Sequence, residues 1–444
     1  MGKLSKLVTK HEKLIRDAHA YLWANPETGF KEFKTSKYME DKFIELGYDI
    51  VRAENITGFY TTIDTGRAGP TLLVLGELDS VICPSHPDAD KTTGAVHSCG
   101  HSAQCSALLG VAAALKEPSA LDELSGKIKL CAVPAEELLE IEYRSNLIKK
   151  GVIKYYGGKT EFIHRGYFDD VDLAFMVHTT SKSPTFNVIN GAVGIIAKNV
   201  EFLGQASHAG GAPWNGKNAL YAATTAINAC NALRETFKES DIIRFHPIIT
   251  SGGSIVNAIP ESTKIESFVR GKTFDAIVEA NDRLNQAIIG GALALDCNVN
   301  IDDKAGYAPL INSTDLIKVA KEAHAISDLS LPFVYTDETW SASTDMGDLS
   351  CIMPVVHPYA PGAVGKAHGN DYYVNDVDNA CIGSAKWQLS MIEILLSNGA
   401  TRAKEIVENF KPMFTKEEFL TFYDSLSRSG NRITYADGEA KVNL

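Results

Sequence analysis

Three apolar runs in the first half of the chain constrain its fold most. They are TLLVLG at residues 71–76, KIKLCAV at residues 127–133 and LAFMV at residues 173–177. Apolar runs of this length are typical of strands that are buried on both faces of a parallel sheet. Helical segments lie between them, at residues 106–117 and 138–151. This alternation of strands and helices predicts an α/β fold built on a largely parallel sheet.

Possible ligands follow each of these strands directly. The first strand is followed by Glu77 and Asp79, the second by Glu136 and Glu137, and the third by His178. A later apolar segment, CIMPVV, is followed by His357 and then by His368. In open α/β sheets, ligands bind beyond the carboxyl ends of the strands. We therefore expect these side chains, which are distant in sequence, to converge at one edge of the sheet.

The loop HSCGHSAQ at residues 97–104 adds a thiol and an imidazole to this edge. Its Cys99 and His101 lie directly before an apolar helical segment. A polar turn that contains glycine would explain either residue alone. Together, and beside carboxylates and a further histidine, they favour a site for zinc or a related first-row ion, because thiolate and imidazole suit such ions.

The neighbouring residues Glu136 and Glu137 can divide two tasks between them. Adjacent side chains diverge, so one carboxylate can bind a metal while the other faces the substrate and transfers a proton, and hydrolysis needs both functions. An acidic, solvated helix start is the alternative explanation. Asp79 can orient a ligand histidine from behind, although an aspartate after a strand can also cap a helix.

The pattern changes in the middle of the chain. A chain of 444 residues exceeds one hydrophobic core, and residues 189–304 show the order β-α-β-β-α-β of a ferredoxin-like sandwich. We expect an inserted domain that interrupts a catalytic domain made of residues 1–188 and 305–402. Residues 403–444 are expected to form a helical appendage and a tail.

Seven motifs together resemble one known family, the metal-dependent amidohydrolases of the aminoacylase and carboxypeptidase G group, peptidase family M20. They are HSCGH at 97–101, PAEE at 134–137, VH at 177–178, GQASHAGGAPWNGKNAL at 204–220, GGSIVNAIP at 252–260, STDMGD at 343–348 and GKAHGND at 365–371. They occur in the family's order and cover nearly the whole chain. The likeness is greatest to the branch with p-aminobenzoyl-glutamate hydrolase, hippurate hydrolase and indoleacetyl-amino-acid hydrolases.

This resemblance implies a zinc-peptidase-like catalytic domain, with a mixed, largely parallel sheet between helices, and an inserted ferredoxin-like lid that dimerises. It also implies two divalent metal ions per protomer, which Zn, Mn, Ni or Co could supply. The metal ligands implied are Cys99, His101, Glu137, His178 and His368, with Cys99 bridging the two ions. Glu136 becomes the general base.

The resemblance assigns three residues of the inserted domain to the substrate. His208 is similar to a histidine that reaches into the active site of the partner protomer and stabilises the oxyanion. Asn257 and Arg270 are similar to residues near the carboxylate or carbonyl group of the substrate. A solvated charge at the end of a strand is the alternative for Arg270.

The chain departs from the branch at three positions near the implied ligands. The branch often has aspartate and histidine where this chain has Ser102 and Gln104, and two aspartates where it has Glu77 and Asp79. These changes leave the implied ligands in place. They alter the polar groups around them, and substrate preference can change with them.

We therefore expect a metal-dependent amidohydrolase that cleaves an N-acyl or N-aroyl amino acid or a small dipeptide. A metal-activated water would attack the amide, with Glu136 as general base. Two alternatives stay open. One is a hydrolytic deaminase that removes the amine from an aromatic ring with the same activated water, and the other is a metal-stabilised binding protein without turnover.

The overall charge favours a small-molecule substrate. The formal net charge of −12 repels nucleic acid and anionic membrane surfaces. No run approaches the ~18 apolar residues of a membrane span, and the charged N-terminal segment lacks the apolar core of a signal peptide. We expect a cytoplasmic protein.

Overall fold

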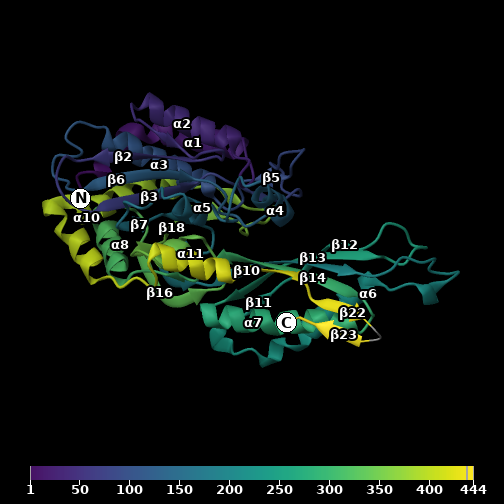
Figure 1. Ribbon diagram of the computed structural model, residues 1–444. Coiled ribbons are helices and arrows are strands. Elements are labelled where there is room, and N and C mark those ends of the chain that lie inside the picture. The colour runs from purple at the N-terminus through teal and green to yellow at the C-terminus, as the bar shows by residue number, and fades with distance from the viewer. Residues whose placement is uncertain (1, 437–438, 444) are drawn as a thin grey trace. The chain divides into compact units, whose positions relative to one another are not determined.

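A computed structural model describes residues 2–436 and 439–443, and the chain divides into two compact units. The first unit runs from the N-terminus to Gly191 and adds Leu310–Glu338 and Thr344–Lys416. The second unit consists of Ala192–Pro309, Thr339–Ser343 and the residues from Glu417 onward. Figure 1 labels the elements of both. The domain limits inferred from the sequence, at residues 188, 304 and 402, stay a prediction.

The first unit is built on a six-stranded sheet, and the largely parallel sheet predicted from the sequence is confirmed. Its strands, in spatial order, are β1 (Val51–Arg52), β2 (Phe59–Asp64), β6 (Lys127–Val133), β3 (Thr71–Glu77), β7 (Leu173–Phe175) and β17 (Val355–Val356). The four strands from β6 to β17 run parallel, and β2 runs antiparallel to β6. Every residue of β3 is buried, which explains its continuous apolar sequence.

The helices of this unit are α1 (Glu12–Ala24), α2 (Phe33–Glu45), α3 (His101–Leu115), α4 (Ile141–Lys149), α5 (Gly158–His164), α8 (Thr314–Ile326), α9 (Met346–Ser350) and α10 (Ser384–Asn409). Helix α3 is buried along its whole length, because it packs against β3, α1 and α10. Figure 1 shows α1 beside α3. A Cβ atom on Gly110 would lie 2.5 Å from Ile15 Cδ1, so glycine permits this close packing.

Shorter strands position the loops that carry polar residues. The strands β8 (His178–Thr180), β9 (Phe186–Ala192), β15 (Leu310–Ile311), β16 (Phe333–Trp340) and β18 (Pro358–Pro361) form a second sheet. Two hairpins pair β4 (Val81–Ile82) with β5 (Ala95–Val96), and β19 (Ala363–Val364) with β20 (Tyr373–Val374). The loop between β19 and β20 contains His368, and its ends are held together by the hairpin.

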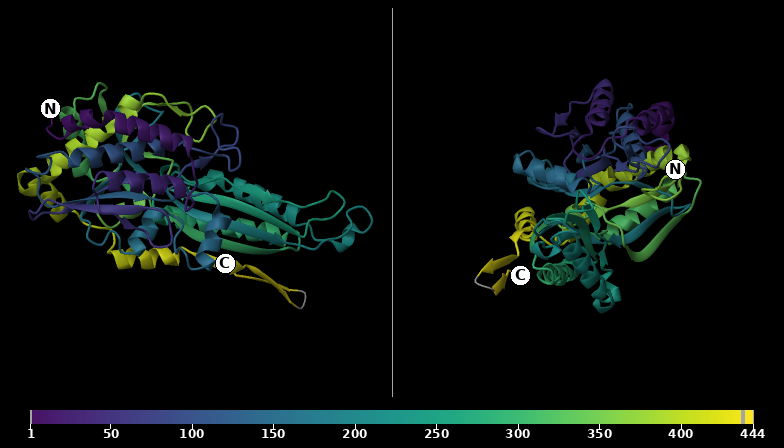
Figure 2. Two further views of the ribbon diagram at one scale, coloured as in Figure 1. Left: turned by 90° about the horizontal axis from the view of Figure 1, so that it is seen from above. Right: turned by 90° about the vertical axis from the view of Figure 1, so that its right-hand side faces the viewer.

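The second unit is an antiparallel sheet with two long helices, as the sequence predicts for a ferredoxin-like sandwich. Its elements in chain order are β10 (Gly194–Leu203), α6 (Ala219–Ala232), β11 (Arg244–Phe245), β12 (Ile248–Ser251), β13 (Ser262–Gly271), α7 (Phe274–Leu293) and β14 (Asn298–Tyr307). Strand β13 pairs with β12 and β10, and β10 pairs with β14. Figure 2 shows these long strands lying side by side, in teal and green.

Small residues bring the two helices of this unit together. A Cβ atom on Gly291 of α7 would lie 2.5 Å from the backbone nitrogen of Ala226 of α6. Asn218 caps α6 and Thr273 caps α7, each by accepting a backbone N–H. The sequence therefore specifies both the helix starts and their close approach.

Residues 403–444 contain the end of α10, the helix α11 (Lys416–Ser425) and the strands β21 (Arg428–Asn431), β22 (Ile433–Ala436) and β23 (Glu439–Val442). Strand β21 pairs with β14 and so extends the sheet of the second unit. The β22–β23 hairpin is the yellow ribbon near the C-terminus in Figure 2.

No helix in residues 2–436 and 439–443 combines the length and the apolar character needed to cross a membrane. The cytoplasmic location expected from the sequence stays a prediction.

Candidate metal centre

Cys99 and His101 lie where strand β5 leads into helix α3. Gly100 between them has a φ of +95°, in the left-handed region, and a Cβ atom there would lie 2.6 Å from the hydroxyl oxygen of Tyr372. Glycine is therefore required by the backbone conformation and by the space. His101 is the first residue of α3 and is fully buried. The glycine turn thus presents a thiol and an imidazole within three residues.

His101 is oriented by Asp79. Its Nδ1 atom lies 3.1 Å from Asp79 Oδ1 and 2.9 Å from the Asp79 carbonyl oxygen, so Nδ1 carries the proton and donates it. The second carboxylate oxygen of Asp79 accepts the backbone N–H of Glu137 at 2.7 Å. The other imidazole nitrogen, Nε2, is buried and has no hydrogen-bond partner. Asp79 therefore couples His101 to the glutamate turn and leaves Nε2 available for a cation.

The turn after β6 carries Glu136 and Glu137, and several groups hold its backbone. Ala135 has a φ of +56°, and its N–H donates to the buried carboxylate of Glu32 at 2.8 Å. The guanidinium group of the buried Arg144 donates to the carbonyl oxygens of Ala135 and Glu137. These contacts fix the directions in which the two glutamate side chains leave the turn.

Two groups of possible ligands share the sulfur of Cys99. One is Cys99, His101 and His178, the other is Cys99, Glu137 and His368, and the ligand atoms of each group lie within 4.8 Å of one another. The Cys99 Sγ atom lies 3.6 Å from His178 Nε2, and Glu137 Oε1 lies 3.1 Å from His368 Nε2. Two ligands at ~2.0–2.3 Å from a tetrahedral ion are roughly 3.3–3.6 Å apart.

The chemistry of these donors fits two divalent ions that share a thiolate. Sulfur, imidazole nitrogen and carboxylate oxygen are the ligands of zinc and related ions. Glu137 Oε1, like His101 Nε2, is buried with no hydrogen-bond partner, which is costly without a bound cation. The assignment of individual ligands stays a prediction.

The charges around Cys99 favour its thiolate. Burial and the carboxylate of Glu137 raise the pKa of the thiol, but the neighbouring imidazoles of His101 and His178 outweigh them and bring the pKa to about 6. At neutral pH, the ionised form therefore predominates. The thiolate is the form of cysteine that binds metals.

Glu136 lies beside this cluster in neither of the two groups that share Cys99. Its Oε2 atom is 3.9 Å from His101 Nε2, and its side chain is buried. Burial raises the pKa of Glu136 well above that of an ordinary carboxyl group, and the carboxylates of Glu77 and Glu137 raise it further. A carboxyl group that accepts a proton readily is suited to general base and general acid chemistry.

Four buried polar residues next to the cluster were not predicted as site residues. They are Glu77, Gln104, Lys159 and Asp345, which contact one another by hydrogen bonds and ion pairs. Glu77 and Gln104 are visible in the sequence as departures from the related branch, and Asp345 lies in the STDMGD motif. Lys159 gives no such signal, because a lysine in GGKTEFIH is expected to be a solvated helix residue.

The remaining predicted site residues, His208, Asn257 and Arg270, belong to the second unit. His208 is exposed, and its Nδ1 atom accepts the backbone N–H groups of Gly211 at 2.9 Å and Gly210 at 3.2 Å. The proton of the neutral imidazole is therefore on Nε2, which can donate outward.

Arg270 and Asn257 have different surroundings. The guanidinium group of Arg270 donates to Ser343 Oγ at 2.9 Å and to His246 Nε2 at 3.2 Å, and it lies over the ring of Phe268. Asn257 is exposed, and its carbonyl oxygen accepts the N–H of Ala209 at 2.9 Å. Arg270 is thus oriented by neighbours, whereas Asn257 is held through its backbone.

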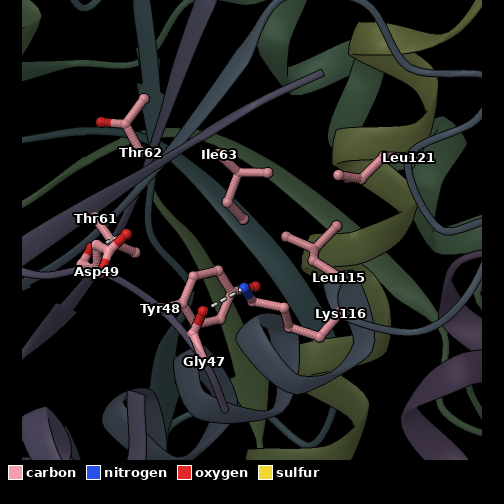
Figure 3. A pocket seen from close by; sticks show the side chains of 9 residues that line it. All are labelled: Gly47, Tyr48, Asp49, Thr61, Thr62, Ile63, Leu115, Lys116 and Leu121. Carbon is pink, nitrogen blue, oxygen red and sulfur yellow. Dashed lines mark hydrogen bonds between the residues drawn. The ribbon is translucent and has the colours of Figure 1, made fainter. Parts of the chain in front are cut away.

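A separate pocket in the first unit does not have the chemistry of the metal cluster. It measures about 200 Å³ and is lined by Gly47, Tyr48, Asp49, Thr61, Thr62, Ile63, Leu115, Lys116 and Leu121 (Figure 3). The ammonium group of Lys116 lies over the Tyr48 ring and donates to the Gly47 carbonyl oxygen at 2.7 Å. Its lining contains no cysteine or histidine, so we place no chemistry there.

Comparisons with known proteins agree with this geometry. The sequence profile of "Peptidase family M20/M25/M40" matches residues 73–393. The chain is 30% identical over 273 residues to the Xaa-Arg dipeptidase of Mus musculus, an alignment that covers 59% of this chain and 57% of that protein. It is 26% identical over 341 residues to one of the two chains of the p-aminobenzoyl-glutamate hydrolase of Escherichia coli strain K12, which covers 65% of this chain and 72% of that protein.

A solved structure shows the same fold. It is a dinuclear metal-binding peptidase of the M20 family from Bacillus subtilis, with a TM-score of 0.64 and 18% identity, and the match covers 87% of this chain and 99% of that chain. The chain also spans little more than half the length of the mouse relative.

Proposed function

The chain belongs to Peptidase family M20/M25/M40, a family of metal-dependent hydrolases that act on carbon–nitrogen bonds, and we propose that it cleaves the amide bond of an N-acyl or N-aroyl amino acid or of a small dipeptide. One observation carries the proposal. Two groups of possible ligands share Cys99, and the carboxylate of Glu136 lies beside them. The names of two relatives support the substrate class, since p-aminobenzoyl-glutamate is an N-aroyl amino acid and Xaa-Arg is a dipeptide.

In this proposal, Cys99, His101 and His178 hold one divalent ion, and Cys99, Glu137 and His368 hold a second. Zn, Mn, Ni and Co all suit this mixture of sulfur, nitrogen and oxygen ligands. A bound divalent ion acidifies water and polarises a carbonyl group, which is the chemistry that amide hydrolysis requires. Asp79 supports the arrangement by orienting His101 through Nδ1.

Glu136 is the general base in the proposed reaction. Its carboxylate takes a proton from the water that attacks the amide carbonyl, and then gives that proton to the nitrogen of the leaving amine. Its neighbour Glu137 is assigned to an ion, so the two adjacent glutamates have separate tasks. The buried position of Glu136 supports this role, because burial favours the protonated form between the two transfers.

The second unit supplies the oxyanion donor and the dimer contact. His208 has an outward Nε2–H that can donate to the developing oxyanion, and we assign it to the active site of a partner protomer. A homodimer through this unit is supported by β12, whose residues are all exposed. In the part of the chain that the structure describes, β12 pairs with β13 alone. Trp214 and Val256 are 78% and 101% exposed in the same unit.

Arg270 and Asn257 are assigned to the carboxylate or carbonyl group of the substrate. Arg270 is half-buried, and its guanidinium group is held by Ser343 and His246. An oriented guanidinium group recognises a carboxylate through paired hydrogen bonds, which suits an amino acid product.

The test compares the metal-loaded protein with a Glu136→Gln variant on a panel of substrates. The panel contains N-acyl amino acids, p-aminobenzoyl-glutamate, dipeptides and aminobenzoates, and mass spectrometry identifies the products. We expect one amide to be cleaved, and Glu136→Gln to lower kcat by roughly two or more orders of magnitude. Glu40→Gln is the control, because Glu40 of α2 is a buried carboxylate that pairs with Arg52.

Each other outcome contradicts a part of the proposal. Full turnover by a folded, metal-loaded Glu136→Gln protein would refute the general base. Release of ammonia from an aminobenzoate, without amide cleavage, would establish aromatic deamination. Metal-dependent stability with no turnover on any substrate would favour a binding protein.

A further inference from the structure

Glu77 lies at the end of β3, and both of its carboxylate oxygens have close polar neighbours. The side chain is fully buried. Its Oε1 atom accepts a hydrogen bond from Lys159 Nζ at 2.5 Å, and its Oε2 atom accepts one from Gln104 Nε2 at 2.8 Å. The same Oε2 atom lies 3.2 Å from Nε2 of His101. One oxygen of Glu77 thus faces a lysine and the other faces a proposed metal ligand.

The contact between Glu77 and His101 lacks the geometry of a hydrogen bond. Nε2 of His101 has no hydrogen-bond partner, although Glu77 Oε2 is within 3.2 Å of it. The proton of His101 is on Nδ1, toward Asp79. A carboxylate oxygen and an unprotonated nitrogen at this distance repel each other unless a cation lies between them. Their separation is close to the roughly 3.3 Å expected for two ligands on one tetrahedral ion.

Lys159 makes this arrangement possible by compensating the charges behind the site. Its ammonium group pairs with Glu77 and with Asp345, and all three side chains are fully buried. The backbone N–H of Lys159 also donates to Asp345 Oδ2 at 3.0 Å. The lysine therefore occupies one oxygen of Glu77 and fixes the carboxylate plane. The second oxygen remains on the side of His101.

Two departures from the related branch meet at this contact. Glu77 is one methylene group longer than the aspartate that is common there, which extends its carboxylate by about 1.5 Å. Gln104 stands where histidine is common, and its amide donates to Glu77 Oε2. The longer acid and the amide donor are therefore parts of one hydrogen-bonded unit.

We propose that Glu77 is an additional ligand of the ion assigned to Cys99, His101 and His178, held in place by Lys159 and Gln104. Glu77, His101 and Glu136 themselves form a third group whose possible ligand atoms lie within 4.8 Å of one another. The inference rests on the proposed metal site. It gives the ion at this position a carboxylate ligand in addition to two imidazoles and the shared thiolate.

The test measures metal binding by the full chain, independently of turnover. Metal-free protein is titrated with Co²⁺, and the stoichiometry, the affinity and the visible d–d spectrum are recorded for wild type and for Glu77→Gln. We expect two Co²⁺ ions to bind the wild type. The variant should bind one of them at least about tenfold more weakly and give an altered spectrum, because an oxygen ligand has lost its charge.

Asp303→Asn is the matched control. Asp303 is a buried carboxylate that pairs with the buried Lys198 and accepts from Asn281 at 2.9 Å, in the second unit. Its environment therefore repeats the lysine and the amide donor of Glu77 without nearby metal ligands. Asp303→Asn should lower stability and leave both Co²⁺ affinities and the spectrum unchanged.

The outcomes separate this inference from the proposed function. If Glu77→Gln binds both ions with wild-type affinity and spectrum, Glu77 is only a counter-ion of Lys159, and the inference is wrong. If the wild type binds no Co²⁺, the proposed metal site fails as well. If Glu77→Gln does not fold, Gln104→Leu is measured instead. It removes only the donor to Oε2, and unchanged binding by that variant would equally refute the inference.

Discussion

Replacing Lys159 by methionine tests the charge balance behind the metal cluster. Methionine has a similar length and no charge, so the change removes the ammonium group and leaves the carboxylates of Glu77 and Asp345 in place. All three side chains are fully buried, and the lysine pairs with both acids. Breaking a buried ion pair by removing one partner costs about 3–5 kcal/mol, because the remaining charge is buried without compensation.

This loss should be visible in the melting temperature of metal-free protein. A change of 1 kcal/mol shifts Tm by roughly 2–4 °C in domains of 150–250 residues. A loss of about 3–5 kcal/mol therefore corresponds to about 6–20 °C. Thermal melts and urea denaturation followed by circular dichroism in EDTA would measure it. Lys198→Met removes the lysine of the buried Lys198–Asp303 pair in the second unit and should cost a similar amount.

The loss should also depend on pH. Burial raises the pKa of Glu77, but the charges of Lys159 and His101 outweigh it and bring the pKa from 4.5 to about 2. A depressed pKa in the folded state stabilises the protein above the unfolded pKa, and that stability is lost as pH falls through the folded pKa. Wild type and Lys159→Met should therefore differ most at neutral pH and converge between pH 4.5 and about 2. A loss below about 1 kcal/mol, or one that is equal at low and neutral pH, would refute the reasoning.

Two further predictions concern the second unit. His208→Ala should lower kcat by about 10²–10³ with little change in KM, because an oxyanion donor acts in the transition state, and steady-state kinetics on the cleaved amide would show a loss in KM alone if His208 only binds substrate. Val256→Asp places a charge on a fully exposed apolar position and should convert a dimer into a monomer in light scattering, whereas an unchanged dimer mass would exclude this face as the contact.

Much of the fold followed from local patterns. The apolar run of β3 predicted a buried parallel strand, because a strand covered on both faces has no polar side to show. The order β-α-β-β-α-β predicted the antiparallel sheet of the second unit, and the structure has that sheet. Resemblance to known motifs identified the family, which the match over residues 73–393 confirmed.

The candidate site was predictable in residue type more than in contact. Cys99, His101 and Glu137 could be selected because unusual ligand types follow strand ends or a glycine turn. The orientation of His101 by both the carbonyl and the carboxylate of Asp79 could not, because it depends on the distance and angle between two loops. Residue patterns carry no such coordinates.

The sequence by itself determined the strands, the helix starts and the residues able to bind a metal, since each depends on neighbours along the chain. Only the tertiary structure decided that Glu77, Gln104, Lys159 and Asp345 meet in one buried network. Lys159 lies 82 residues after Glu77 and 186 before Asp345. A lysine's charge is tolerable in the interior only when folding brings opposite charges to it, and that requirement is not written in any local stretch of sequence.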